Sequence, residues 1–213
     1  MPRLLLILIL ALLVPLHAAR ADYAEGERAY TAKQWVAAIA VLRPLVDAGD
    51  ERAAFLLGKM YLDGNGVIPN AVEAMGLYRK AAAKGNTDAM ISIGAIYQGG
   101  IGFKKNAKTA NEWYARAARI GSQYAAFIYG VSLFQGDVTE KTDFKPDPAA
   151  AYKWFRVAAT TGNYPKVKEA AEAAATAASN RLKGVEITRI DNEVLQWQAT
   201  PNADLGPLPE LTP

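Results

Sequence analysis

The chain repeats itself with a period of 36 residues, and this period constrains the fold more than any other feature of the sequence. Gly58, Gly94 and Gly130 are spaced by this interval. The same step relates further small and aromatic residues: Ala53, Ala89 and Ala125, Gly64, Gly100 and Gly136, Tyr78 and Tyr114, and Gly85 and Gly121. A third copy of the second half follows with five additional residues, at Ala151, Phe155, Ala158 and Gly162. A fixed period of this length is typical of stacked structural units.

Each unit has the pattern of two helices. In the first helix, small and apolar residues recur at three- and four-residue spacing, as at Ala53, Leu57 and Tyr61. A turn with two glycines follows, where glycine tolerates the positive φ that ends a helix. The second helix carries one apolar stripe: Ala74, Leu77, Tyr78, Ala81 and Ala82. One such hairpin cannot bury its apolar faces alone, so we expect an all-α protein, an α-solenoid of stacked helical hairpins.

These motifs resemble a known family. The pattern A-x-x-x-[LI]-G-x-x-Y-x-x-G-x-G, followed by A-x-x-[LW]-Y-x-x-A-A-x-x-G, is similar to the Sel-1-like repeat, a relative of the tetratricopeptide repeat. Residues 51–86 and 87–122 match it well, and residues 123–163 match it with a loop insertion and with Val138 in place of the second turn glycine. Residues 22–50 resemble a shorter, tetratricopeptide-like first hairpin.

The two ends of the chain depart from the repeat. Residues 164–200 contain two stretches with helical spacing, which we expect to form capping helices over the last repeat. Residues 201–213 hold four prolines and few core-forming residues, a composition typical of a disordered tail. At the other end, residues 1–21 have the basic, apolar and small-residue order of a signal peptide, with cleavage expected between Ala21 and Asp22.

The apolar run at residues 4–16 is shorter than the ~20 residues that span a bilayer, which favours a signal peptide over an anchor. We therefore expect an exported protein of the periplasm of a Gram-negative bacterium, with no membrane span after signal removal. The formal charge of +3 includes Arg3 and Arg20, so the mature chain keeps 22 basic against 21 acidic residues. This balance argues against a nucleic-acid partner.

The residue types of the mature chain limit its chemistry. The sequence has no cysteine, and its only histidine, His17, lies within the signal. Nucleophile pairs with histidine, zinc sites of the usual cysteine and histidine kind, and thiol redox centres are therefore excluded. We expect no enzymatic activity, no cofactor and no metal.

The resemblance to tetratricopeptide-like stacks implies a concave groove lined by the first helices of the hairpins. By that analogy the partner-binding groove contains Arg52, Phe55, Lys59, Leu62, Ile91, Gln98, Tyr124, Phe127 and Phe134, and also Asp88, Ala95, Val131 and Gln135. A contiguous apolar surface of this kind usually marks a partner site. Arg52 and Lys59 would orient the partner at one end. The alternative is that the first hairpin or the C-terminal helices cover part of this surface. The inserted loop at residues 137–146 is a second candidate for partner contact, or a tolerated insertion.

The resemblance also implies a function. Similar proteins act as scaffolds or regulators in the bacterial envelope, so we expect an adaptor that binds a protein or peptide partner in the envelope through this groove. One alternative is binding of peptidoglycan or exopolysaccharide, with groove aromatics stacking on sugars. Another is a hydrolase similar to a β-lactamase, an activity associated with cysteine-rich members, whose paired cysteines this chain lacks.

Overall fold

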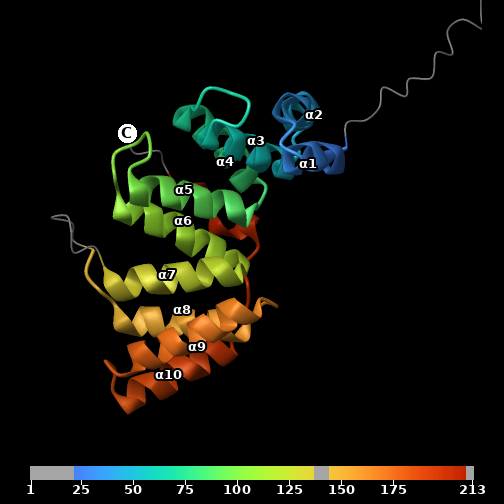
Figure 1. The fold of residues 1–213 in the computed structure, drawn as a ribbon. Helices are drawn as coiled ribbons and strands as arrows, with labels where there is room; N and C mark the ends of the chain where they lie inside the picture. Colours follow the sequence, from blue (N-terminus) through green and yellow to red (C-terminus); the bar gives the residue numbers. More distant parts are fainter. Residues whose placement is uncertain (1–21, 137–143, 210–213) are drawn as a thin grey trace, which may run out of the picture.

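The computed structural model describes residues 22–136 and 144–209, and within these ranges the chain is helical throughout (Figure 1). The predicted signal peptide lies outside the described residues. The helices are α1 Tyr23–Thr31, α2 Trp35–Asp47, α3 Glu51–Asp63, α4 Ala71–Ala83, α5 Thr87–Gly99, α6 Ala107–Ile120, α7 Gln123–Gln135, α8 Pro148–Thr160, α9 Pro165–Ser179 and α10 Gly184–Leu195. None of them is long and apolar enough to cross a membrane.

The helices form hairpins that stack in chain order, which confirms the predicted α-solenoid. The pairs α1 with α2, α3 with α4, α5 with α6 and α7 with α8 pack against each other, and each second helix also packs on the hairpin that follows. Helix α9 packs on α7 and α8, and α10 packs on α8. In Figure 1 the stack runs from the blue N-terminal hairpin to the orange pair α9 and α10 at the opposite end.

One contact recurs inside the hairpins and explains the period of the glycines. Gly58, Gly94 and Gly130 face the rings of Tyr78, Tyr114 and Phe155, respectively. A Cβ added at any of these three glycines would come closer than 3.0 Å to the ring of the facing side chain. The helices of a hairpin can therefore approach this closely only where glycine stands in the first helix.

The helix starts recur with the same period. The side chains of Asp50, Asn86 and Ser122 accept hydrogen bonds from backbone N–H groups in the first turns of α3, α5 and α7. The second helices α4, α6 and α8 begin in the same way at Asn70, Asn106 and Asp147. Because N-caps satisfy N–H groups that lack partners within the helix, these residues set where each helix of the stack begins.

The C-terminal segment differs from the prediction of a disordered tail. Residues 200–209, here called the tail, return from α10 to the ends of α4 and α6 and include a short 3-10 helix at Asn202–Leu205 (Figure 1). The Thr200 N–H donates to the Arg119 carbonyl at 2.7 Å, and Arg79 Nη1 donates to the Pro209 carbonyl at 2.7 Å. The prolines keep the tail out of any long helix, but its carbonyls remain available as acceptors. Residues 210–213 lie outside the described part of the chain.

We expect the close glycine contact to be testable with a pair of alanine substitutions. Gly94→Ala should lower the free energy of unfolding by ~1–3 kcal/mol, because the methyl group overlaps the Tyr114 ring. The matched control is Gly76→Ala in α4, where the site is exposed and nothing lies within 4 Å of an added Cβ. There the better helix former should raise stability by ~0.5–1 kcal/mol. Urea unfolding of the mature chain measures both, and equal effects at the two sites would contradict the packing account.

Burial of Tyr114 should make the fold sensitive to alkaline pH. Burial, together with the nearby Tyr124, raises the pKa of Tyr114 from 10.0 to about 12. Above pH 10 the unfolded chain releases this proton and the folded chain does not, so stability is complete below pH 10 and falls as the pH rises toward 12. Tyr114→Phe should remove ~2–3 kcal/mol of this loss.

The same variant should cost ~1 kcal/mol at pH 9, because the Tyr114 hydroxyl donates to Gln98 Oε1 at 2.9 Å. Unfolding midpoints at pH 9 and pH 11.5 separate the two effects. The exposed Tyr164 provides the control, since Tyr164→Phe should keep the pH dependence of the unmodified chain. An unchanged alkaline loss in Tyr114→Phe would assign that loss to other groups.

Candidate partner-binding site

A cavity of about 330 Å³ opens on the face that the first helices α3, α5 and α7 form together. We call it the groove cavity. Its lining residues come from three repeats and are Phe55, Lys59, Leu62, Asp63, Tyr78, Asp88, Ile91, Ser92 and Tyr124. The stacking of the hairpins thus brings residues that are up to 69 positions apart in the sequence to one site.

Six of the predicted groove residues line this cavity: Phe55, Lys59, Leu62, Asp88, Ile91 and Tyr124. Positions 55, 59 and 62 share one face of α3 because they are separated by four and three residues. The Phe55 ring lies 5.8 Å from the Tyr78 ring, so its position depends on the same tyrosine that faces Gly58. Tyr124 is half exposed, and an exposed aromatic side chain of this kind is typical of a residue that contacts a partner.

Phe127 and Phe134 do not line the groove cavity. Their rings lie 6.0 and 6.4 Å from the ring of Phe155, and both are partly buried against the core. The guanidinium of Arg181, which follows α9, lies 4.1 Å from the centre of the Phe134 ring. The C-terminal helices therefore cover this end of the predicted apolar surface, which corresponds to the alternative that the sequence left open.

The predicted cations are held by the first hairpin. Arg52 donates to Asp50 at 3.1 Å, lies 4.5 Å from the centre of the Tyr23 ring, and lines a separate cavity of about 640 Å³. The Lys59 ammonium lies 5.7 Å from the centre of the Tyr30 ring. Gln98 is exposed but accepts the Tyr114 hydroxyl, and it lies outside the groove cavity.

Two carboxylates in the groove cavity change its charge from the one that the sequence led us to expect. Asp63, at the end of α3, was not among the predicted groove residues, whereas Asp88 was. With Lys59 as the single cation among the lining residues, the cavity carries more negative than positive charge. Burial and then the charge of Asp63 raise the pKa of Tyr78 far above its ordinary value, so this hydroxyl stays neutral. The signal that could have identified Asp63 is its place one turn after Lys59, directly before the turn glycine.

A neighbouring cavity of about 460 Å³ shares Asp88 and Tyr124 with the groove cavity and reaches the start of α9. We call it the side cavity. Its wall is fixed by Gln123, which is buried, donates to the Ala158 carbonyl at 2.9 Å and accepts the Tyr164 N–H at 3.0 Å. Tyr164 is 67% exposed at the rim. The two cavities are therefore adjacent at Asp88 and Tyr124, near the N-terminal ends of α5 and α7.

The site offers apolar contact, carboxylates and exposed aromatic rings, a combination suited to binding. Within residues 22–136 and 144–209, no group of three histidine, cysteine or acidic residues is placed to hold a metal ion. Of the inserted loop, residues 137–143 lie outside the described residues. Phe144 lines a different cavity, next to α6.

Comparison with known proteins agrees with this architecture. The Sel1 repeat family matches residues 51–86, 87–122 and 123–163, which together make up more than half of the chain. A Sel1 repeat protein from Oxalobacter formigenes is similar in structure, with a TM-score of 0.52, 30% identity, and coverage of 63% of this chain and 97% of that protein.

A protective antigen of uropathogenic Escherichia coli strains with an SLR fold gives a TM-score of 0.48 at 17% identity, over 92% of this chain and 51% of the antigen. Among curated protein sequences no significant match was found. Sel1 repeat proteins generally act as scaffolds for interactions between proteins. Matched over three consecutive repeats, this chain belongs to the Sel1 repeat family.

Proposed function

We propose that this protein is an exported adaptor of the periplasm that binds a protein partner in the groove cavity. The observation that carries the proposal is the groove cavity itself, where three repeats place apolar side chains, two carboxylates and the half-exposed Tyr124 around one opening. Hot spots of protein interfaces are rich in such aromatic residues at the centre of a partly desolvated pocket.

The lining residues define the chemistry of the partner. Phe55, Leu62 and Ile91 are partly buried and leave apolar surface for an aliphatic or aromatic anchor. Asp63 and Asp88 stand at exposed positions of the same cavity and favour a lysine or arginine next to that anchor. The partner segment is therefore a helix or extended peptide with one apolar anchor and an adjacent basic residue.

A second candidate function is the binding of an envelope glycan. It is favoured by one observation, that Tyr124 and Tyr164 both expose their rings at the side cavity. Co-sedimentation of the mature chain with purified peptidoglycan tests it directly. Retention that requires both tyrosines, without any captured protein, would favour this function over the adaptor.

Separate replacement of Tyr124 and of Tyr164 should distinguish these two functions, because Tyr124 lines both cavities and Tyr164 lines the side cavity alone. Tyr124→Ala should weaken capture of the protein partner by ~10- to 100-fold, because it removes the exposed aromatic ring of the groove cavity. The matched control is Tyr164→Ala, which removes a ring from the side cavity alone. Both side chains are substantially exposed, so both variants should keep the fold. Pull-down from envelope extract with quantitative mass spectrometry measures the captured protein.

Removing the negative charges of the groove cavity tests the same site independently in the same pull-down experiment. Asp63→Asn with Asp88→Asn should weaken capture and reduce its dependence on salt, because the two carboxylates attract a basic residue. Val72, which is 67% exposed on α4 away from both cavities, supplies a neutral control as Val72→Ala. Unchanged capture by both Tyr124→Ala and the double asparagine variant would contradict the proposed binding site.

Export has its own test. In a Gram-negative host the protein should be recovered from the osmotic-shock fraction with Asp22 as its first residue, because Ala19 and Ala21 are the small residues that a signal peptidase reads. Intact-mass measurement detects the removal of residues 1–21. Ala21→Phe should keep those residues attached. Recovery of an unprocessed chain in the cytoplasm would contradict export.

A further inference from the structure

The tail occupies a surface formed by the second helices of two neighbouring repeats. Asn202 donates its side-chain amide to the carbonyls of Ala82 and Ala83 at 3.4 and 3.1 Å, at the end of α4. Thr200 donates to Arg119 at the end of α6. The last carbonyls of a helix lack their usual partners within it, and the tail supplies donors to those of Ala83 and Arg119.

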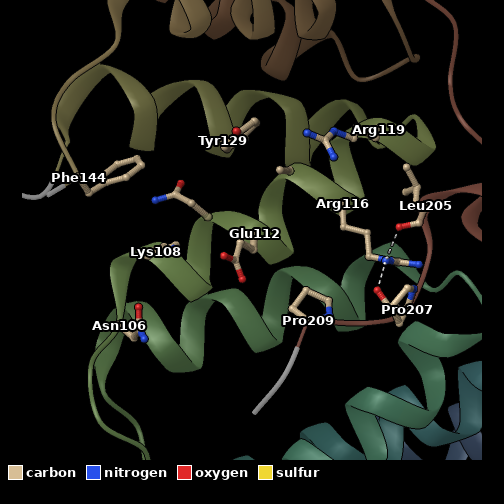
Figure 2. Close-up of a pocket in the computed structure, with 12 residues that line it drawn as sticks. Asn106, Lys108, Glu112, Arg116, Arg119, Tyr129, Phe144, Leu205, Pro207 and Pro209 are labelled. Carbon is tan, nitrogen blue, oxygen red and sulfur yellow. Dashed lines mark hydrogen bonds between the residues drawn. The ribbon is translucent and has the colours of Figure 1, made fainter. Parts of the chain in front are cut away.

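Arg116 holds the tail through its whole guanidinium group (Figure 2). Nε donates to Asn202 Oδ1 at 3.1 Å, and the two Nη atoms donate to the carbonyls of Asn202, Leu205, Gly206 and Pro207 at 2.8–3.4 Å. In the part of the chain that the structure describes, no ion pair involves Arg116. Neutral oxygens of the tail therefore take the place of water around its guanidinium group, and its burial lowers its pKa.

These hydrogen bonds recognise mainly the backbone of the tail, and they involve few of its side chains. Apart from Asn202, the acceptors of Arg116 and Arg79 are main-chain carbonyls. No tail residue whose side chain the structure describes is buried, and Leu208 alone of them packs against the core. An element of the core would be buried, whereas a segment held at the surface by hydrogen bonds can be displaced by another segment that makes the same bonds. Proline favours such an extended path, because its ring limits the conformations that must be lost on binding.

The tail fills only part of the surface. A cavity of about 850 Å³ lies along α6 beside it, with Leu205, Pro207 and Pro209 on the tail side. Figure 2 shows Asn106, which precedes α6, and Lys108 and Glu112 of α6, together with Tyr129 and Phe144, around the remaining space. From Lys108 to Arg119 this face of α6 extends ~17 Å, the length of about five extended residues. A segment that follows the carbonyl path and also places side chains in this space gains contacts that the tail does not make.

We propose that this face of α4 and α6 is a second peptide-binding site, which the tail occupies in cis and which an extended, proline-containing segment of a partner protein occupies by displacing it. The tail then acts as an internal competitor. A short tether holds it at an effective concentration of about millimolar, so a partner segment binds only when its additional contacts outweigh that advantage. This site is separate from the groove cavity and does not depend on the function proposed for it.

A chain that ends at Ala199 tests the proposal with a labelled peptide of residues 200–213 as the probe. Fluorescence anisotropy should show saturable binding to the shortened chain and at least ~10-fold weaker binding to the full mature chain. Arg116→Gln in the shortened chain should weaken binding at least ~10-fold, since Arg116 donates five hydrogen bonds. The matched control is Arg28→Gln, because Arg28 is an exposed arginine of α1 that is not among the residues lining this cavity. A folded shortened chain that does not bind the peptide would overturn the proposal.

A second measurement uses the full mature chain and so does not require the shortened chain to fold. The sequence has no cysteine, so a spin label at Asp204→Cys, an exposed tail position, reports on the tail alone. An excess of unlabelled peptide should make the label mobile, and Arg116→Gln should make it mobile without peptide. An immobile label at millimolar peptide would show a fixed structural element and overturn the proposal.

Peptide selection and analytical sedimentation test whether the site binds a segment of a partner protein or the tail of a second copy of this chain. Displayed peptides selected on the shortened chain should contain proline and should lose binding to its Arg116→Gln version. Sequences that bind both versions equally would speak against the site. Sedimentation of the full mature chain should show a monomer. A dimer that Arg116→Gln dissolves would assign the site to the tail of a second copy and overturn the assignment to a partner protein.

Discussion

The structure depends on the contact between a glycine of each first helix and an aromatic ring of the second. At Gly58, Gly94 and Gly130 the absence of a Cβ lets the ring approach the helix backbone. The ring then supports the side chain that lies beside it on the first-helix face, as Tyr78 does for Phe55 and Phe155 for Phe127. The glycine–ring contact that holds the two helices of a hairpin together thus also positions the side chains on the first-helix face. Tyr78 shows this directly, since it both meets Gly58 and lines the groove cavity.

The groove cavity exists because the repeats are unequal on their exposed face. The core positions of the period hold the same residue types, whereas position 55 and its equivalents hold Phe55, Ile91 and Phe127. Positions one turn later hold Lys59, Ala95 and Val131. The smaller Ile91, between two repeats with phenylalanine at the same position, leaves space on α5, and the cavity opens there. In a stack of this kind the shared residues build the frame, and the differences between repeats create the specificity.

The period predicted the fold because each contact that it encodes is local, within a hairpin or between neighbours. The six predicted groove residues that line one cavity lie on first helices, where the resemblance to tetratricopeptide-like stacks placed them. The surroundings of Phe134 could not be predicted, because they depend on where Arg181, after α9, packs. The bound conformation of the tail could not be predicted for a different reason. Arg116 bonds residues 86 to 91 positions away, mostly through carbonyls that every residue possesses, so the sequence of the tail carries little trace of the contact.

The groove cavity and the tail site share one element, α4. Tyr78 of this helix lines the groove cavity, and the next residue, Arg79, donates to the tail and lies 5.6 Å from the centre of the Trp113 ring of α6. The tail joins α4 to α6 on the second helices, while the groove cavity lies between their partners α3 and α5. Coupling between two sites requires an element whose position both ligands change. A ligand of either site can influence the other only by altering how these two repeats pack, and the hydrogen bonds of Asn202 and Arg116 span that junction.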